Sequence, residues 1–311
     1  MDLSPKISII IPVYNSPYLE ECIKSCYGQS IGSNLIEIII VNDASNNDTK
    51  NKLIELENRY DLKIIHLAQN SGPANARNIG MQSAKGNYIT FLDSDDMMKS
   101  DKLEKQFKFL SNNTDIDIVI SGIDEIDQNG NFIRTLTRKF SDNKHKQLEI
   151  IFLDNLHTIT STLLFKKNLI DNSGYMNPKL LNLEDMDFVI KLLNVGNMHY
   201  MPEGLTIRRV LQSGLSNTVS ESIFLDSRNT FFHNTIKMFP FLNNIANEYW
   251  ALNYSRFGRI LQKRGLGDQA RKFHWKSINY KLNFIGLMGF ILSFFPNQFQ
   301  KYIANKNWRK K

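Results

Sequence analysis

Three carboxylates follow directly on an apolar run near residue 90 and mark the first place where this chain could do chemistry. Residues 89–98 read ITFLDSDDMM, so Asp93, Asp95 and Asp96 crowd the end of a strand that is expected to be buried. Like charges at this distance raise one another's pKa, and burial adds to the effect. A divalent cation or the hydroxyls of a ligand would relieve the repulsion. A simple polar turn would explain the same residue types, so the cluster alone leaves both interpretations open.

Polar side chains also follow the other strands predicted before this point. Asn15 ends the run KISIIIPVYN, Asp43 follows LIEIIIVN, and Asn70 follows LKIIHLA. In open α/β sheets, ligands bind in the crevice at the carboxyl ends of parallel strands. We therefore expect Asn15, Asp43, Asn70 and Asp93 to line one site.

Strand and helix patterns alternate through this first half. Nearly continuous apolar runs predict buried parallel strands at residues 6–15, 35–45, 62–68 and 87–96. Helical spacing predicts helices at residues 16–30, 48–60 and 73–86. Ser16 is expected to cap the first helix, with Pro17 at its first position. The alternation predicts an α/β fold, in which helices cover both faces of a mostly parallel open sheet.

The second half is predicted to extend this sheet and then to become helical. The patterns favour helices at residues 101–110, 145–155 and 183–196, strands at 115–122 and 157–167, and a turn at QNGNF. From about Glu221 the strand pattern stops, and helices interrupted by Pro240, RGLGD and Pro296 follow. We therefore predict a sheet domain at residues 1–220, which carries the candidate site, and a helical region at residues 221–311.

The charge of the chain is unevenly distributed. The net charge of +7 divides into about +12 for residues 251–311, with thirteen Lys and Arg and one acid, and about −5 for the rest. This asymmetry favours a polyanionic partner for the tail, either a membrane surface or a nucleic acid. The apolar run FIGLMGFILSFFP in the tail is too short to span a bilayer, which needs about 20 residues. Its apolar surface makes nucleic acid the weaker candidate and an anionic membrane surface the stronger one, with plain packing of a helical subdomain as the alternative.

Cysteine usage and the N-terminus bear on the compartment. Cys22 and Cys26 lie four residues apart in a predicted helix, where we expect them to pack in the core. The segment MDLSPKISIII lacks the basic and apolar regions of a secretory signal. These features predict a cytoplasmic protein. Together with the basic, apolar tail, they predict peripheral binding at the inner face of the cell membrane.

The turn after the first strand excludes two common phosphate-binding motifs. It reads PVYNSPY and lacks the glycines of a dinucleotide-binding turn or of a P-loop. Pro12 and Tyr14 instead offer flat surfaces for a base, and Asp43 can accept a hydrogen bond from a base imide. Arg77 can reach a phosphate. A metal at the aspartate cluster would neutralise a diphosphate in place of glycine amides.

Four segments together carry a family resemblance: ISIIIPVYN, EIIIVNDASNNDT, NSGPANARNIGMQSAKGNYITFLDSDD and NLEDMDFVIKLL. In this order and spacing, the chain resembles the family 2 glycosyltransferases, inverting enzymes with a GT-A fold, of the bacterial surface-polysaccharide type. The resemblance covers roughly residues 6–216, and residues 221–311 lie outside it.

The resemblance implies a role for each matching position. Pro12 and Tyr14 would flank the nucleobase of the donor. Asp185 would be the catalytic base of the reaction. Asp95 of the D-x-D element would ligate a divalent metal, Mn²⁺ or Mg²⁺. The implied nucleotide-sugar-binding residues are Pro12, Tyr14, Asp43, Asn70, Arg77, Asp93, Ser94 and Asp95. Ordinary explanations also exist, because acids are favoured at the start of a helix and as helix caps.

One segment departs from the family pattern. Relatives often show an arginine, a histidine and serines after the helix that carries the base, whereas this chain reads IRRVLQSGLS with Leu211 at the histidine position. A histidine contact with metal or phosphate is therefore not expected here. Arg208, Arg209 or Gln212 is expected to replace it.

These observations favour an inverting, metal-dependent glycosyltransferase of the hexosyl or N-acetylhexosaminyl type. It would move sugar from a nucleotide sugar, most simply a UDP-sugar, to a hydroxyl of a glycan or lipid-linked acceptor in cell-surface polysaccharide biosynthesis. A sugar-1-phosphate nucleotidyltransferase is the enzyme alternative, although PVYNSPY is not its glycine-rich basic loop. A non-catalytic polysaccharide-assembly subunit is the other alternative.

Overall fold

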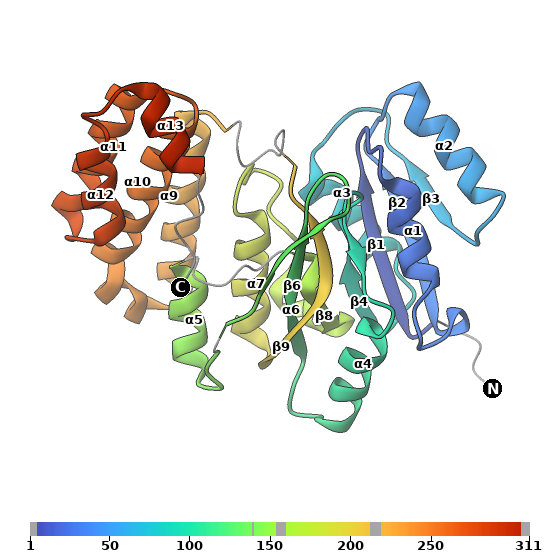
Figure 1. Cartoon of the computed structure of the whole chain (residues 1–311). Coiled ribbons are helices and arrows are strands. Elements are labelled where there is room, and N and C mark those ends of the chain that lie inside the picture. The colour runs from blue at the N-terminus through green and yellow to red at the C-terminus, as the bar shows by residue number, and fades with distance from the viewer. Residues whose placement is uncertain (1–4, 139, 154–159, 212–218, 306–311) are drawn as a thin grey trace. The chain divides into compact units, whose positions relative to one another are not determined.

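The computed structural model describes residues 5–138, 140–153, 160–211 and 219–305 (Figure 1). It divides the chain into two compact units, Met1–Gln212 and Ser213–Lys311. The division falls a few residues before the boundary predicted at residue 220. The first unit is a mixed α/β structure and the second is helical, which confirms the predicted fold class.

The first half of the sheet is parallel and positions the candidate site. In space the strands lie in the order β3-β2-β1-β4, with bounds β1 (Ile7–Val13), β2 (Ile36–Asn42), β3 (Lys63–His66) and β4 (Tyr88–Phe91). Three helices connect them: α1 (Leu19–Tyr27), α2 (Asn47–Glu57) and α3 (Pro73–Ser83). Since the strands are parallel, the loops that follow them lie along one edge of the sheet.

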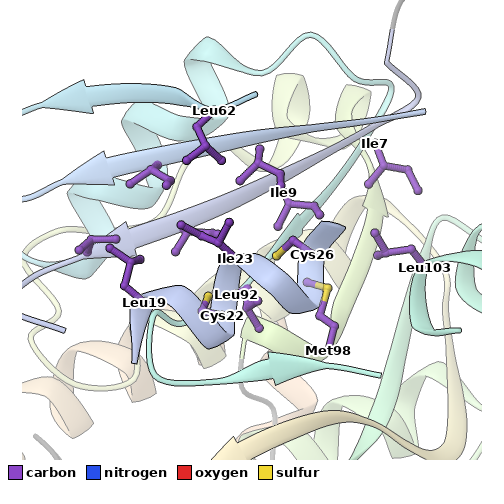
Figure 2. Close-up of a cluster of buried hydrophobic side chains, with 14 of the residues drawn as sticks. Ile7, Ile9, Leu19, Cys22, Ile23, Cys26, Leu62, Leu92, Met98 and Leu103 are labelled. Atoms are coloured by element: carbon purple, nitrogen blue, oxygen red, sulfur yellow. The ribbon is translucent and has the colours of Figure 1, made fainter. Parts of the chain in front are cut away.

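The alternation of side chains along β1 places helices on both faces. Ile7, Ile9, Ile11 and Val13 share one buried cluster with the apolar face of α1 (Figure 2). Ile10 points the other way, toward α3, where a Cβ on Gly80 would lie only 2.3 Å from its Cγ2. A strand buried on both sides needs a nearly continuous apolar sequence, which is the pattern of this segment.

The two cysteines belong to the cluster beside α1. Cys22 and Cys26 are free thiols with no exposed surface, and Figure 2 shows them between the helix and the sheet. The prediction that they pack in the core is confirmed.

The second half of the sheet is mixed. It continues in the order β4-β8-β6-β9-β5, with β7 paired to β6. Only β6 and β9 are parallel among these pairs. The strands are β5 (Met97–Met98), β6 (Ile118–Ile126), β7 (Phe132–Leu136), β8 (Leu163–Lys166) and β9 (Met198–Arg209). The helices of this half are α4 (Lys102–Asn112), α5 (Lys144–Phe152), α6 (Ile170–Ser173) and α7 (Glu184–Val195).

Two sequence expectations fail in this half. The predicted strand at residues 157–167 is shorter, because Thr160–Thr162 form a 3₁₀ turn before β8 and residues 154–159 lie outside the described chain. The long strand β9 was not predicted, because Pro202 and a register shift between Met201 and Gly204 interrupt its pattern.

The second unit is a helical array. Its helices are α9 (Glu221–Met238), α10 (Ala246–Lys263), α11 (Gly267–Tyr280), α12 (Phe284–Leu292) and α13 (Asn297–Asn305), with a 3₁₀ segment at Pro240–Ile245. Phe224, Phe257 and Phe273 form the centre of its core. No helix within residues 5–138, 140–153, 160–211 and 219–305 is long and apolar enough to cross a membrane.

Candidate active site

The loops after β1 and β2 are tied together by side chains. The Asn15 amide donates to Ser45 Oγ at 3.1 Å, and the Asn46 amide donates to Asn15 Oδ1 at 2.8 Å. Pro12, near the end of β1, is half-buried, and Tyr14, just after the strand, is 55% exposed. Tyr14 is therefore accessible to a planar ligand at this edge.

Asp43 organises the next loop. It is buried, and its Oδ1 accepts hydrogen bonds from the Ser71 amide at 2.7 Å and the Ser71 hydroxyl at 3.0 Å. Its Oδ2 accepts from the Gly72 amide at 2.8 Å. Asp43 thus fixes the turn that begins α3, and the exposed Asn70 immediately precedes that turn. Its predicted contact with a base stays a prediction.

The turn after β4 that holds Asp93, Asp95 and Asp96 is called the aspartate turn. Arg77 connects this turn to α7, the helix that carries Asp185. The guanidinium is buried, with Nη2 at 2.6 Å from Asp93 Oδ1 and Nη1 at 3.6 Å from Glu184 Oε1. Burial opposes the charged form, but the attraction of Asp93 and Glu184 outweighs it, so the pKa of Arg77 lies above its usual value. Nε and Nη1 make no hydrogen bond, which leaves two buried donors at the site.

The aspartate turn is electrostatically strained. Burial and the charge of Asp93 raise the pKa of Asp95 from 3.8 to about 6. Burial, Asp93 and Asp95 also raise the pKa of Asp96, whose Oδ1 accepts from the Arg209 amide at 3.0 Å. The crowding of acids noted in the sequence is therefore present in the fold.

Ser16 does not cap the first helix as predicted. α1 begins at Leu19 with Tyr18 at the cap position, and the Ser16 hydroxyl donates instead to the carbonyl of Ser94 at 2.9 Å. The bond joins the β1 loop to the aspartate turn, 78 residues later in the chain. The Ser16 side chain therefore makes a tertiary hydrogen bond in place of the predicted helix cap.

The binding of a divalent cation by Asp95 stays a prediction. Asp93 is bound to Arg77 and Asp96 to a backbone amide, so Asp95 is the carboxylate best placed to ligate. Within the described residues no group of three or more acidic, histidine or cysteine side chains could hold a metal. A protein that supplies few carboxylates is typical of Mg²⁺ sites, in which substrate phosphates complete the coordination.

The helix that carries the predicted base begins at a strained residue. Leu183 has a φ of 75°, and α7 starts directly after it with Glu184 and Asp185 in its first turn. Asp185 is partly exposed, and its Oδ1 accepts from the Met186 amide at 2.8 Å. The start of a helix favours the ionised form of a carboxylate. Asp187, by contrast, is buried and pairs with Lys191 at 2.7 Å.

Three non-glycine residues with positive φ lie beside the candidate site. Among the described residues they are Asn15 (52°), Ala44 (57°) and Leu183 (75°). They adjoin Tyr14, Asp43 and Glu184 respectively. The left-handed region is unfavourable for residues with a Cβ by roughly 1–2 kcal/mol, and such strain tends to cluster at functional sites.

The two arginines expected to replace the family histidine each pair with a carboxylate. Arg208 contacts Glu125. Arg209 pairs with Glu21 at 2.6 Å, and its guanidinium lies 4.1 Å from the centre of the Tyr18 ring. Gln212 lies outside the described residues. Arg208 and Arg209 both lower the pKa of Asp95, so both act electrostatically on the aspartate turn.

The structure therefore brings several predicted residues together and adds one. Arg77, Asp93 and the start of α7 form one connected group, and Asp43 holds the turn beside Asn70. Glu184 is not among the residues that the sequence predicted for the site, but its approach to Arg77 gives it a place there. No signal in its own sequence neighbourhood predicts that partner, 107 positions earlier.

Comparison with known proteins identifies the family. Residues 8–174 match the sequence model of glycosyl transferase family 2. An uncharacterized glycosyltransferase of Rickettsia prowazekii is 33% identical over 221 residues, which is 69% of this chain and 67% of that protein. One from Methanocaldococcus jannaschii is 33% identical over 193 residues, 61% of this chain and 65% of that protein. The chain belongs to glycosyl transferase family 2, and it is a glycosyltransferase.

Two further similarities concern narrower functions and the fold. A Bacillus subtilis glycosyltransferase, whose name assigns it to teichuronic acid biosynthesis, is 42% identical over 108 residues, 34% of this chain and 42% of that protein. The crystal structure of Staphylococcus aureus TarS 1–349 with UDP-GlcNAc superposes with a TM-score of 0.58 at 18% identity, covering 93% of this chain and 90% of that one. At this identity the superposition supports the fold alone.

Proposed function

We propose that the enzyme is an inverting, metal-dependent glycosyltransferase that uses a UDP-sugar. Its acceptor would be a hydroxyl of a glycan or lipid-linked molecule in cell-surface polysaccharide biosynthesis. The observation that carries this proposal is the bridge made by Arg77, which joins Asp93 of the D-x-D element to Glu184, the neighbour of Asp185. In this proposal the bridge would couple the binding place of the donor diphosphate to the catalytic base.

The proposed chemistry needs few protein groups. In a direct displacement at the anomeric carbon, Asp185 accepts the proton of the acceptor hydroxyl while that oxygen attacks. Asp185 would be the stronger base after the bound acceptor displaces water from it. Mn²⁺ or Mg²⁺, held by Asp95 and the donor phosphates, would neutralise the departing diphosphate.

The same geometry suggests how the donor is held. Tyr14 and Pro12 would flank the base, and Asp43 would position it together with Asn70. Arg77 would contact the nucleotide, and two of its buried donors, Nε and Nη1, make no hydrogen bond in this structure. Nucleotide-sugar binding by a protein of the same fold, TarS with UDP-GlcNAc, supports a UDP-sugar here.

A donor-hydrolysis assay tests the reaction. With Mn²⁺, the enzyme should release UDP from UDP-sugars, and Asp185→Asn should bind UDP as the wild type does but release UDP from the donor about 10²-fold or more slowly. UDP release that persists in Asp185→Asn would remove this residue as the base. Release of pyrophosphate from UTP and a sugar-1-phosphate would instead identify a nucleotidyltransferase.

We further propose that the second unit contacts an anionic membrane, at the inner face of the cell membrane. In α12 the small residues face inward, because Gly286 and Gly289 are buried and a Cβ on Gly289 would lie 2.2 Å from His274 Cε1. Large apolar side chains are left outside on α12, α13 and their flanks: Leu282, Phe284, Ile285, Leu287, Ile291, Phe294, Phe295, Phe299 and Tyr302. A water-facing helix normally shows the opposite pattern.

Charge selects lipid as the occupant of this apolar surface. Residues 251–311 hold thirteen basic residues and one acid, and basic residues combined with exposed aromatic and aliphatic side chains are typical of interfacial membrane binding. Replacing Phe284 and Phe295 with Gln should weaken sedimentation with phosphatidylglycerol vesicles but leave donor hydrolysis unchanged. Phe132→Gln, at an exposed phenylalanine of β7, is the matched control. If the double variant changes the oligomeric state and not vesicle binding, the surface is a contact between two copies.

A further inference from the structure

Three charged side chains form a row across neighbouring strands of the first unit. In the sheet register Glu125 of β6 stands opposite Arg134 of β7 on one side and Arg208 of β9 on the other. Opposed residues in neighbouring strands project from the same face of a sheet. Glu125 Oε2 lies 2.5 Å from Arg134 Nε, and its Oε1 contacts Arg208 Nη2.

The row has a net positive charge, because two arginines share one carboxylate. The Glu125 side chain is only 3% exposed, whereas those of Arg134 and Arg208 are 30% and 28% exposed. Burial works against ionisation of Glu125, but the two arginines overcome it and hold its pKa below the usual value. One buried carboxylate therefore contacts two partly exposed arginine side chains.

Each arginine also keeps donors to spare. Arg134 uses Nε, and Arg208 uses Nη2, in their contacts with Glu125. Among the described residues, the remaining N–H groups of Arg134 and Arg208 make no further hydrogen bond or ion pair. Arg209, the neighbour of Arg208, differs because Glu21, the Tyr18 ring and the Gln128 carbonyl already occupy its guanidinium. Guanidinium forks with free N–H groups are suited to phosphate oxygens.

The position of the row bears on which phosphate it would meet. Met97 of β5 directly follows the aspartate turn and pairs with Ile207, next to Arg208. The backbone of Arg134 stands three strands away from β5, which corresponds to about 14 Å at the usual spacing between strands. Both guanidinium groups reach the same carboxylate from their own strands. The Arg134 end of the row is therefore the end farther from a diphosphate at the aspartate turn.

We propose that Arg134 and Arg208, oriented by the buried Glu125, form an anion site for a phosphate group of the acceptor. This inference rests on the proposed function and narrows its acceptor to a phosphate ester. A site that bound only the donor diphosphate would have the same chemistry, and the experiment below distinguishes the two sources.

Inorganic phosphate is the probe, titrated into the full-length protein already saturated with UDP and Mn²⁺. Wild type should bind phosphate under these conditions, and Arg134→Gln should weaken the binding about tenfold while UDP affinity stays the same. Arg59→Gln is the matched control, because Arg59 is an exposed arginine of the first unit, just after α2, that pairs with Glu20 and Glu55. Equal phosphate affinity in Arg134→Gln and wild type would overturn the proposal.

Two further results test the role of Glu125 and the source of the bound phosphate. Glu125→Gln removes the carboxylate that orients both arginines, so it should weaken phosphate binding several-fold while UDP affinity stays the same. Phosphate binding that is unchanged in Glu125→Gln would contradict the orienting role of Glu125. Phosphate binding that UDP abolishes would assign the row to the donor and overturn the acceptor assignment. Since neither measurement uses sugar transfer, both are independent of whether Asp185 is the base.

Discussion

Replacing Asp95 with Asn should stabilise the metal-free enzyme at neutral pH. In the folded chain the pKa of this carboxyl is raised from 3.8 to about 6 by burial and by Asp93. Above both values the side chain is ionised in the folded and in the unfolded chain, and the ionised form is less favourable in the folded one. Each pKa unit corresponds to 1.36 kcal/mol, so a difference of about two units gives roughly 3 kcal/mol as an upper value.

The sign follows from proton linkage. Because the folded pKa is the higher one, the folded chain binds the proton more tightly, and stability falls as the pH rises from about 4 to about 6. Below pH 4 the carboxyl is protonated in both states and the penalty disappears. We therefore expect Asp95→Asn to raise the free energy of unfolding by about 1–3 kcal/mol at pH 7.5, and by much less at pH 4.

The assay is urea unfolding followed by far-UV circular dichroism in the presence of a chelator. Fluorescence would miss the first unit, because all three tryptophans fall after residue 213. Asp43→Asn is the control, since that carboxylate accepts three hydrogen bonds and its neutralisation should lower stability by about 2 kcal/mol. If Asp95→Asn destabilises the protein, or has the same effect at both pH values, the proposed electrostatic strain is absent.

The remaining predictions concern the positioning of the site and the second unit. Glu184→Gln weakens the attraction to Arg77 and should lower kcat about tenfold with little change in UDP affinity; a change in UDP affinity alone would contradict a role in positioning α7. Ser16→Ala removes the bond to the Ser94 carbonyl and should raise the donor KM several-fold, which initial-rate kinetics would measure. Gly289→Ala forces a methyl group against His274 and should destabilise the second unit by about 1–3 kcal/mol. Tryptophan fluorescence follows that transition, and the effect should shrink in a His274→Ala background.

The parallel half of the sheet could be predicted from the sequence because β1, β2 and β4 are largely buried on both faces. Continuous isoleucine and valine runs in β1 and β2 leave little choice of structure, and the polar residues that end these runs mark one edge. β9 could not be predicted in this way, because its pattern is broken at Pro202 and its partner β6 lies about 80 residues earlier. Its place in the sheet depends on tertiary pairing, which single-sequence periodicity does not contain.

The site shows the same division between local and distant information. Asp43, Asp93 and Asp95 could be proposed because each lies within a few residues of the end of a strand. The partner of each side chain could not be foreseen, because Arg77 meets Glu184 and Ser16 meets Ser94 only after the strands have assembled. The row of Arg134, Glu125 and Arg208 likewise depends on the register of three strands, none of which has an unusual sequence.

The three hydrogen bonds of Asp43 have a consequence for motion on long timescales. The amides of Ser71 and Gly72 belong to a loop, where backbone protons normally exchange with solvent quickly. Here they donate to a buried carboxylate, so their exchange with deuterium should be as slow as that of amides inside β2. An amide of this turn can exchange only when the contact with Asp43 opens. Its exchange rate in wild-type enzyme would therefore measure how often the turn at Ser71 and Gly72 opens away from Asp43. A nucleotide bound at this turn should slow the exchange further.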